Sequence, residues 1–151
     1  MSDLSQYEDL HGIQGRIIVI DDDEIDGMVT GRYLRRLMPD AETELIDNGP
    51  DALSRLSEVS ATGQNVLLVF IDQKLPGMTG LEILQRLQET GLSDRVPFVL
   101  FSSAVAPTEV EAVLAAGARD YVVKPIEPDE YLKSLAEAVR RHAPASRAHL
   151  A

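Results

Sequence analysis

Short apolar runs rich in branched residues recur along the chain. They occupy residues 17–20, 66–71, 98–101 and 121–123, and a weaker run covers residues 43–46. Four of them are apolar almost without alternation, which is typical of strands that helices cover on both faces, as in a parallel sheet. The chain therefore predicts five strands.

Helical periodicity separates these runs. Apolar positions four residues apart, at Val29, Tyr33 and Leu37, predict a helix over residues 24–38. Shorter patterns predict helices at residues 51–56, 81–87 and 110–114, and helix-end signals place the last helix at about 129–142. The alternation of strand and helix predicts an α/β fold with an open, doubly wound sheet and right-handed crossovers.

The length of the chain fits one globular domain. It has 151 residues, of which 44% are hydrophobic and 26% charged, as in an ordinary domain with a sizeable core. We expect a mobile polar leader over residues 1–14, the domain over 15–142 and a flexible tail over 143–151. His11, His142 and His149 lie in the leader, at the boundary of the tail and in the tail, without metal-ligand spacing, and we expect them to be solvated.

Charge and targeting signals exclude several classes of protein. The chain has 25 acidic and 14 basic residues and a formal net charge of -11, which disfavours binding to nucleic acid. The N-terminus lacks the features of a secretory signal, and no apolar run is long enough to span a bilayer. The absence of cysteine excludes thiolate metal sites and cysteine nucleophiles. We expect a cytoplasmic protein that binds neither nucleic acid nor membrane.

Polar residues follow the predicted strands. In open α/β sheets, ligands bind outside the carboxyl ends of the strands, so these residues are the candidates for a functional site. They are Asp21, Asp22 and Asp23 after the first strand, Asp72 after the third, Ser102 and Ser103 after the fourth, and Lys124 after the fifth.

Carboxylates gathered at one edge of a sheet repel one another and lose hydration unless a cation neutralises them. Oxygen ligands without His or Cys suit a hard cation, and a small number of carboxylates favours Mg²⁺ over a Ca²⁺ cage. A carboxylate such as Asp72 can also act as a nucleophile and become an aspartyl-phosphate. The hydroxyl of Ser102 and the ammonium of Lys124 would then hold phosphoryl oxygens.

Each of these residues also has a simpler structural interpretation. Residues 21–23 are of the type that caps helix N-termini, and Asp72 is of the type that begins a turn. Lys124 fits an ordinary surface lysine. A change of one residue in strand register would exchange Ser102 and Ser103, so the hydroxyl assignment stays open between them, with Ser102 preferred.

Four segments resemble the signature segments of bacterial receiver domains. They read IIVIDDDE, VFIDQKLPGMTGLEIL, VPFVLFSSA and AAGARDYVVKPI, stand in the order of the family, and together cover roughly residues 16–142. Four matches in order are specific, whereas one alone is weak. The resemblance is to the chemotaxis-regulator-like receivers of two-component signalling. It implies a flavodoxin-like fold, with a five-stranded parallel sheet in the order 2-1-3-4-5 flanked by five helices.

The resemblance also implies the residues of the phosphorylation site. Asp72 corresponds to the phosphoacceptor of the family, and Asp21 and Asp22 to the acidic pair that binds Mg²⁺, with Mn²⁺ as an alternative. The backbone carbonyl of Lys74 corresponds to a further metal ligand.

Three more residues match the hydroxyl, lysine and switch positions of the family. Ser102 corresponds to the hydroxyl residue, and Lys124 to the lysine that often has a cis bond to the following proline, here Pro125. Tyr121 corresponds to the aromatic switch residue, which in relatives swings inward when the hydroxyl residue moves toward the phosphoryl group.

The implied function is a phosphorylation switch rather than an enzyme. A phosphohistidine of a histidine kinase or of a histidine phosphotransfer protein would donate its phosphoryl group to Asp72. The domain would assist its own phosphorylation and dephosphorylation. We expect a stand-alone regulator that binds a downstream protein, or a second copy of itself, through residues 105–118, Tyr121 and the last helix.

Two other functions compete with this one. A phosphatase with an aspartyl nucleophile would need a second Asp two residues after Asp72 as acid/base, and this chain has Lys74 there. A degenerate receiver would serve only as an interaction module, but the complete set of acidic, hydroxyl and lysine residues argues against it.

Overall fold

The fold is built on one parallel sheet. The computed structural model describes residues 4–143. The strands are β1 (Arg16–Ile20), β2 (Glu42–Ile46), β3 (Val66–Ile71), β4 (Phe98–Ser102) and β5 (Asp120–Val123), and they lie in the order β2-β1-β3-β4-β5. Every pair of neighbouring strands is parallel. The predicted fold class and strand order are confirmed, and each strand agrees with its predicted range to within one residue.

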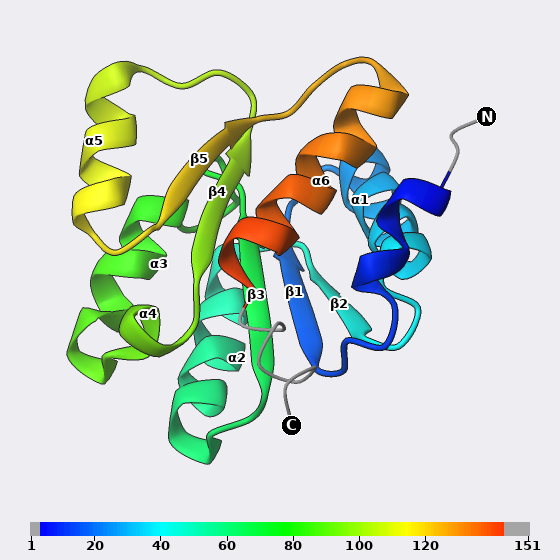
Figure 1. Ribbon diagram of the computed structural model, residues 1–151. Coiled ribbons are helices and arrows are strands. Elements are labelled where there is room, and N and C mark those ends of the chain that lie inside the picture. The colour runs from blue at the N-terminus through cyan, green and yellow to red at the C-terminus, as the bar shows by residue number, and fades with distance from the viewer. Residues whose placement is uncertain (1–3, 144–151) are drawn as a thin grey trace.

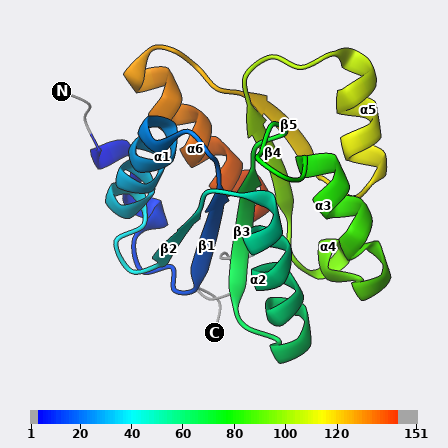
Figure 2. The ribbon, with the colours of Figure 1, turned by 180° about the vertical axis from the view of Figure 1, so that it is seen from behind.

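Helices cover both faces of the sheet. On one face lie α1 (Glu24–Leu37) and α6 (Pro128–His142), as Figure 1 shows. On the other lie α2 (Gly49–Thr62), α3 (Gly80–Leu87) and α5 (Pro107–Ala115), which Figure 2 shows from behind. The 3-10 turn η2 (Gln88–Thr90) and the single turn α4 (Leu92–Arg95) follow α3 and were not predicted. None of the helices in residues 4–143 is long and apolar enough to cross a membrane.

Helix α2 is much longer than the predicted residues 51–56. Its start is defined by Asn48, whose side chain accepts a hydrogen bond from the backbone N–H of Asp51. Its end is defined by Gly63, which has a φ of +67°. The prediction was too short because the helix buries few apolar side chains along its length, so its periodicity is weak.

The core lies on both sides of the sheet, and β3 is buried along its whole length. On the α1 and α6 side, the ring of Phe101 lies edge-on to two aromatic neighbours. Its centroid is 5.7 Å from that of Phe70 and 5.2 Å from that of Tyr131. This packing joins β3, β4 and α6, because the three rings belong to these elements.

The segment before β1 is part of the domain. Ser5–Leu10 forms the 3-10 helix η1, and Tyr7, Leu10 and Ile13 are buried in the core cluster shared with α1 and α6. The guanidinium of Arg140 lies 5.1 Å from the centroid of the Tyr7 ring. The expectation of a mobile polar leader is therefore wrong for residues 4–13, because three apolar residues at three-residue spacing find a core to pack against.

The C-terminal end of α6 also differs from expectation. His142 is not fully solvated, because its Nε2 lies 2.9 Å from a carboxylate oxygen of Asp120 and its side chain is 12% exposed. Apart from Ala143, the predicted tail over residues 143–151, with His149, lies outside the described residues.

Candidate functional site

The carboxyl ends of four strands bring the predicted polar residues together. Ile20 and Ile71 are register partners in β1 and β3, so the residues that follow them, Asp21 and Asp72, emerge side by side. Lys124 is placed in the same way, because its backbone N–H donates to the carbonyl oxygen of Ser102 at 2.8 Å. The sheet register therefore assembles residues that are up to 103 positions apart in the chain.

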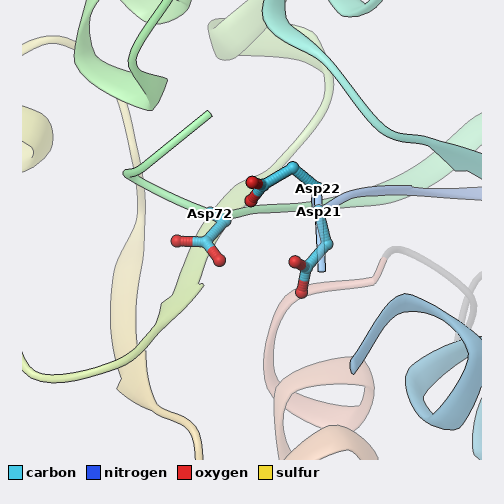
Figure 3. Close-up of side chains that lie close together, drawn as sticks. All are labelled: Asp21, Asp22 and Asp72. Carbon is cyan, nitrogen blue, oxygen red and sulfur yellow. The ribbon is translucent and has the colours of Figure 1, made fainter. Parts of the chain in front are cut away.

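Asp21, Asp22 and Asp72 form an acidic cluster. Each offers one carboxylate oxygen, and these oxygens all lie within 4.8 Å of one another. Figure 3 shows the three carboxylates at the ends of β1 and β3, with that of Asp22 directed toward Asp72. Asp21 and Asp72 are buried, whereas Asp22 is exposed. An oxygen-only donor set of this size, open to solvent on one side, fits a hard divalent cation that keeps several waters.

Lys124 supplies a positive charge to this cluster. Its Nζ donates to Asp21 Oδ2 at 2.7 Å, to Asp72 Oδ2 at 3.0 Å and to Asp26 Oδ2 at 3.1 Å. Burial by itself lowers the pKa of Lys124, but the hydrogen bonds and charges of Asp21 and Asp72 outweigh burial, and the pKa is raised overall. Burial raises the pKa of Asp21, although Lys124 opposes this effect. Lys124 is therefore a charged group of the site and not a surface lysine.

Ser102, and not Ser103, lies against Asp72. Ser102 Oγ donates to Asp72 Oδ1 at 2.5 Å, and the Ser102 side chain is buried. The backbone N–H of Lys74 donates to the same oxygen at 3.2 Å. Ser103 is exposed, because it lies one residue past the end of β4, on the loop that follows.

Asp23 has a structural role. Its side chain accepts hydrogen bonds from the backbone N–H groups of Ile25 and Asp26 and so caps α1. The capping interpretation thus holds for Asp23, while Asp21 and Asp22 point into the cluster. Gly80 is required at the start of α3, because a Cβ there would lie 2.7 Å from the backbone oxygen of Asp72.

Tyr121 contacts the loop between β4 and α5. Its hydroxyl donates to the carbonyl oxygen of Ser103 at 3.2 Å and accepts from the backbone N–H of Val105 at 3.1 Å. The ring is half-buried and packs against the core cluster on the α5 side. Tyr121 is therefore bonded to the segment that follows Ser102.

The expected cis bond between Lys124 and Pro125 is wrong for this structure. The described residues contain no cis peptide bond. The trans form is the intrinsically preferred isomer even before proline.

Sequence reasoning missed two residues beside the site. Asp26 binds Lys124, and its position in the first turn of the helix that follows Asp21 was a signal that it faces the strand ends. Gln73 is buried next to Asp72, and its Oε1 accepts from the backbone N–H of Leu81 at 2.9 Å. No pattern in the sequence marks Gln73, because it follows the end of a strand, where alternation no longer predicts burial.

Comparisons with known proteins point to one family. The family model described as response regulator receiver domain matches residues 17–136. The two-component response regulator ORR3 of Oryza sativa subsp. indica is 33% identical over 114 residues, which cover 76% of this chain and 82% of that protein.

Solved structures with this fold are similar along most of the chain. The response regulator receiver domain from Rhodospirillum rubrum has a TM-score of 0.73 at 24% identity, covering 86% of this chain and 97% of that chain. The Mn²⁺-bound form of response regulator Rcp1 has a TM-score of 0.70 at 20% identity, covering 82% of this chain and 91% of that chain. At these identities the likeness establishes the fold.

Proposed function

The chain belongs to the response regulator receiver family of two-component signalling, and on this premise we propose that Asp72 accepts a phosphoryl group with the help of Mg²⁺. One observation carries the proposal. Asp72 accepts hydrogen bonds from the buried hydroxyl of Ser102 and the ammonium of Lys124, and a carboxylate oxygen of Asp72 lies within 4.8 Å of those of the two other acids in the cluster. These are the groups that an aspartyl-phosphate needs around it.

The proposed donor is a phosphohistidine of a histidine kinase or a histidine phosphotransfer protein. A carboxylate oxygen of Asp72 attacks the phosphorus atom, the P–N bond breaks, and its electron pair returns to the imidazole nitrogen. Asp21, Asp22, Asp72 and the backbone carbonyl of Lys74 would hold the cation, for which Mn²⁺ is an alternative. When bound, the cation neutralises charge on the transferring oxygens.

Ser102 and Lys124 would then bind the phosphoryl oxygens. Ser102 Oγ already donates to Asp72 Oδ1, so a small movement of this hydroxyl redirects it to the phosphoryl group. That movement displaces the loop to which the hydroxyl of Tyr121 is bonded. We propose that Tyr121 reorients in response and changes the surface of residues 105–118, Tyr121 and α6 that a downstream protein, or a second copy, would bind.

In this proposal the domain is a switch and not an enzyme with a separate substrate. It assists the gain and the loss of its own phosphoryl group. A cytoplasmic location stays a prediction from the sequence.

Intact mass spectrometry tests the proposal. We expect the wild-type protein to gain the mass of one phosphoryl group after incubation with acetyl phosphate and Mg²⁺, and to gain none when EDTA is present. Asp72→Asn should gain none, because an amide oxygen is too weak a nucleophile. Asp94→Asn, which removes an exposed acid of α4, is the matched control and should behave as wild type. An unmodified wild-type protein, or equal modification of Asp72→Asn, would contradict the proposal.

A further inference from the structure

The ammonium of Lys124 has a third carboxylate partner, from α1. An ammonium carries three N–H donors, and here Asp21, Asp72 and Asp26 accept from it at 2.7, 3.0 and 3.1 Å. The Lys124 side chain is 8% exposed, so few other partners can reach it. Any new acceptor for Lys124, such as a phosphoryl oxygen, must therefore displace or share one of these three carboxylates.

Asp26 differs from the other two partners. Asp21 and Asp72 belong to the acidic cluster, whereas Asp26 does not. The Asp26 side chain is 38% exposed, against 3% for Asp21 and 11% for Asp72. A cation in the cluster would draw the oxygens of Asp21 and Asp72 to itself, and Asp26 would then be the main counterion of Lys124.

The position of Asp26 is set by the start of α1. Its backbone N–H donates to Asp23 Oδ1 at 3.1 Å. With Lys124 it also lines a pocket between α1 and the connection from β5 to α6. An acid in the first turn of a helix stabilises that helix by itself. Glu24 occupies the same turn and is exposed, so a comparison of Asp26 with Glu24 separates the helix effect from an effect on Lys124.

We propose that Asp26 competes with the phosphoryl group for the ammonium of Lys124 and thereby weakens the affinity of the site for that group. The inference rests on the proposed function. Its physical basis is that the phosphoryl oxygens and Asp26 carry charge of the same sign and face one buried ammonium. The consequence is regulatory: Asp26 shifts the transfer equilibrium away from phosphorylated Asp72 and toward the phosphohistidine donor.

Affinity for beryllofluoride, a noncovalent mimic of the phosphoryl group, tests this competition. Titrations followed by calorimetry in excess Mg²⁺ would compare the wild-type protein with Asp26→Asn, which keeps the shape of the side chain and removes its charge. We expect Asp26→Asn to bind roughly 3- to 10-fold more tightly at low ionic strength. The gain should shrink as salt screens the partly exposed charge.

Three variants complete the experiment. Asp26→Glu restores the charge and should return the affinity to that of the wild type. Asp26→Ser, a second neutral variant, should bind tightly like Asp26→Asn and replaces it if that variant unfolds. Glu24→Gln removes a charge from the same helical turn without touching Lys124, and should change the affinity less than about 2-fold.

The outcomes that overturn the inference are distinct. Unchanged or weaker binding by folded Asp26→Asn would mean that Asp26 does not compete for Lys124. An equal gain in beryllofluoride affinity in Glu24→Gln would mean that the effect comes from removing any negative charge from this turn of α1 and not from the contact with Lys124. If the wild-type protein binds no beryllofluoride in Mg²⁺ and gains no phosphoryl mass, the proposed function fails and this inference fails with it.

Discussion

The two ends of the sheet differ in the balance of acidic and basic side chains. At the amino end, charges are nearly balanced, because two arginines bind three glutamates. Arg16 binds Glu42 and Glu44 at 2.6 and 2.7 Å, and Arg55 binds Glu44 and Glu58 at 2.8 and 3.3 Å. At the carboxyl end, Lys124 faces the carboxylates of Asp21, Asp26 and Asp72, with Asp22 beside them. The first arrangement stabilises the fold modestly, whereas the second leaves an excess of negative charge.

The difference separates structural from functional charge. Ion pairs that remain in contact with water contribute little, typically below 1 kcal/mol each. Buried carboxylates without enough counterions cost stability, and a protein retains them where they bind something. The excess negative charge at the carboxyl end is therefore the feature of the structure that favours a bound cation.

Among the changes that test this difference, removal of the Lys124 ammonium should have the largest effect on stability. Lys124→Met leaves the buried carboxylates of Asp21 and Asp72 without their shared counterion, and we expect it to lower the free energy of unfolding by about 2–4 kcal/mol. Urea unfolding in the presence of EDTA measures this loss. Adding Mg²⁺ should restore more stability to the variant than to the wild type, because the cation replaces the missing positive charge.

Lys133→Met serves as the control for Lys124→Met, because Lys133 is an exposed lysine of α6. It should change the free energy of unfolding by less than about 0.5 kcal/mol. Wild-type stability of Lys124→Met without Mg²⁺ would show that the two buried carboxylates do not depend on this ammonium.

Removal of one carboxylate should have a smaller effect of the opposite sign. Asp22→Asn relieves repulsion within the acidic cluster, and we expect it to raise the free energy of unfolding by about 0.5–1 kcal/mol in EDTA. It should also weaken Mg²⁺ binding, measured from the shifts of backbone amides in NMR titrations. Glu89→Gln, an exposed acid of η2, should change neither quantity. A destabilised Asp22→Asn would contradict the interpretation of the cluster as charge in excess.

The smallest expected effect is on the pH dependence of stability, through Glu44 at the amino end of the sheet. A hydrogen bond from Arg55 lowers the pKa of Glu44 below its ordinary value of 4.5, and Arg16 lowers it further. The ionised Glu44 carboxylate, with its two arginine partners, therefore stabilises the fold at pH values above about 4.5. This contribution is lost as the pH falls through the pKa of Glu44 in the folded protein. In Glu44→Gln, the free energy of unfolding should fall less steeply over that acidic range. If the free energy of unfolding falls equally steeply with pH in the variant and the wild type, Glu44 contributes nothing to the acid dependence of stability.

The sequence predicted the sheet well because buried parallel strands are continuous apolar runs. The run at residues 66–71 became β3, whose six residues are all buried. It also predicted which polar residues meet, because parallel strands end at the same edge of the sheet. The leader was mispredicted because Tyr7, Leu10 and Ile13 are too few to give a periodic signal, and they are buried only through the surfaces of α1 and α6.

The residues by themselves determined the fold class, the order of its elements and the acidic, hydroxyl and lysine set, since each follows from local patterns along the chain. Only the tertiary structure decided that Ser102 rather than Ser103 reaches Asp72, and that Asp26 shares the ammonium of Lys124. These contacts depend on strand register and on the direction of α1, which join residues distant in the sequence. The charge balance at each end of the sheet is likewise a property of the assembled fold, because it depends on which side chains the strands and helices bring into contact.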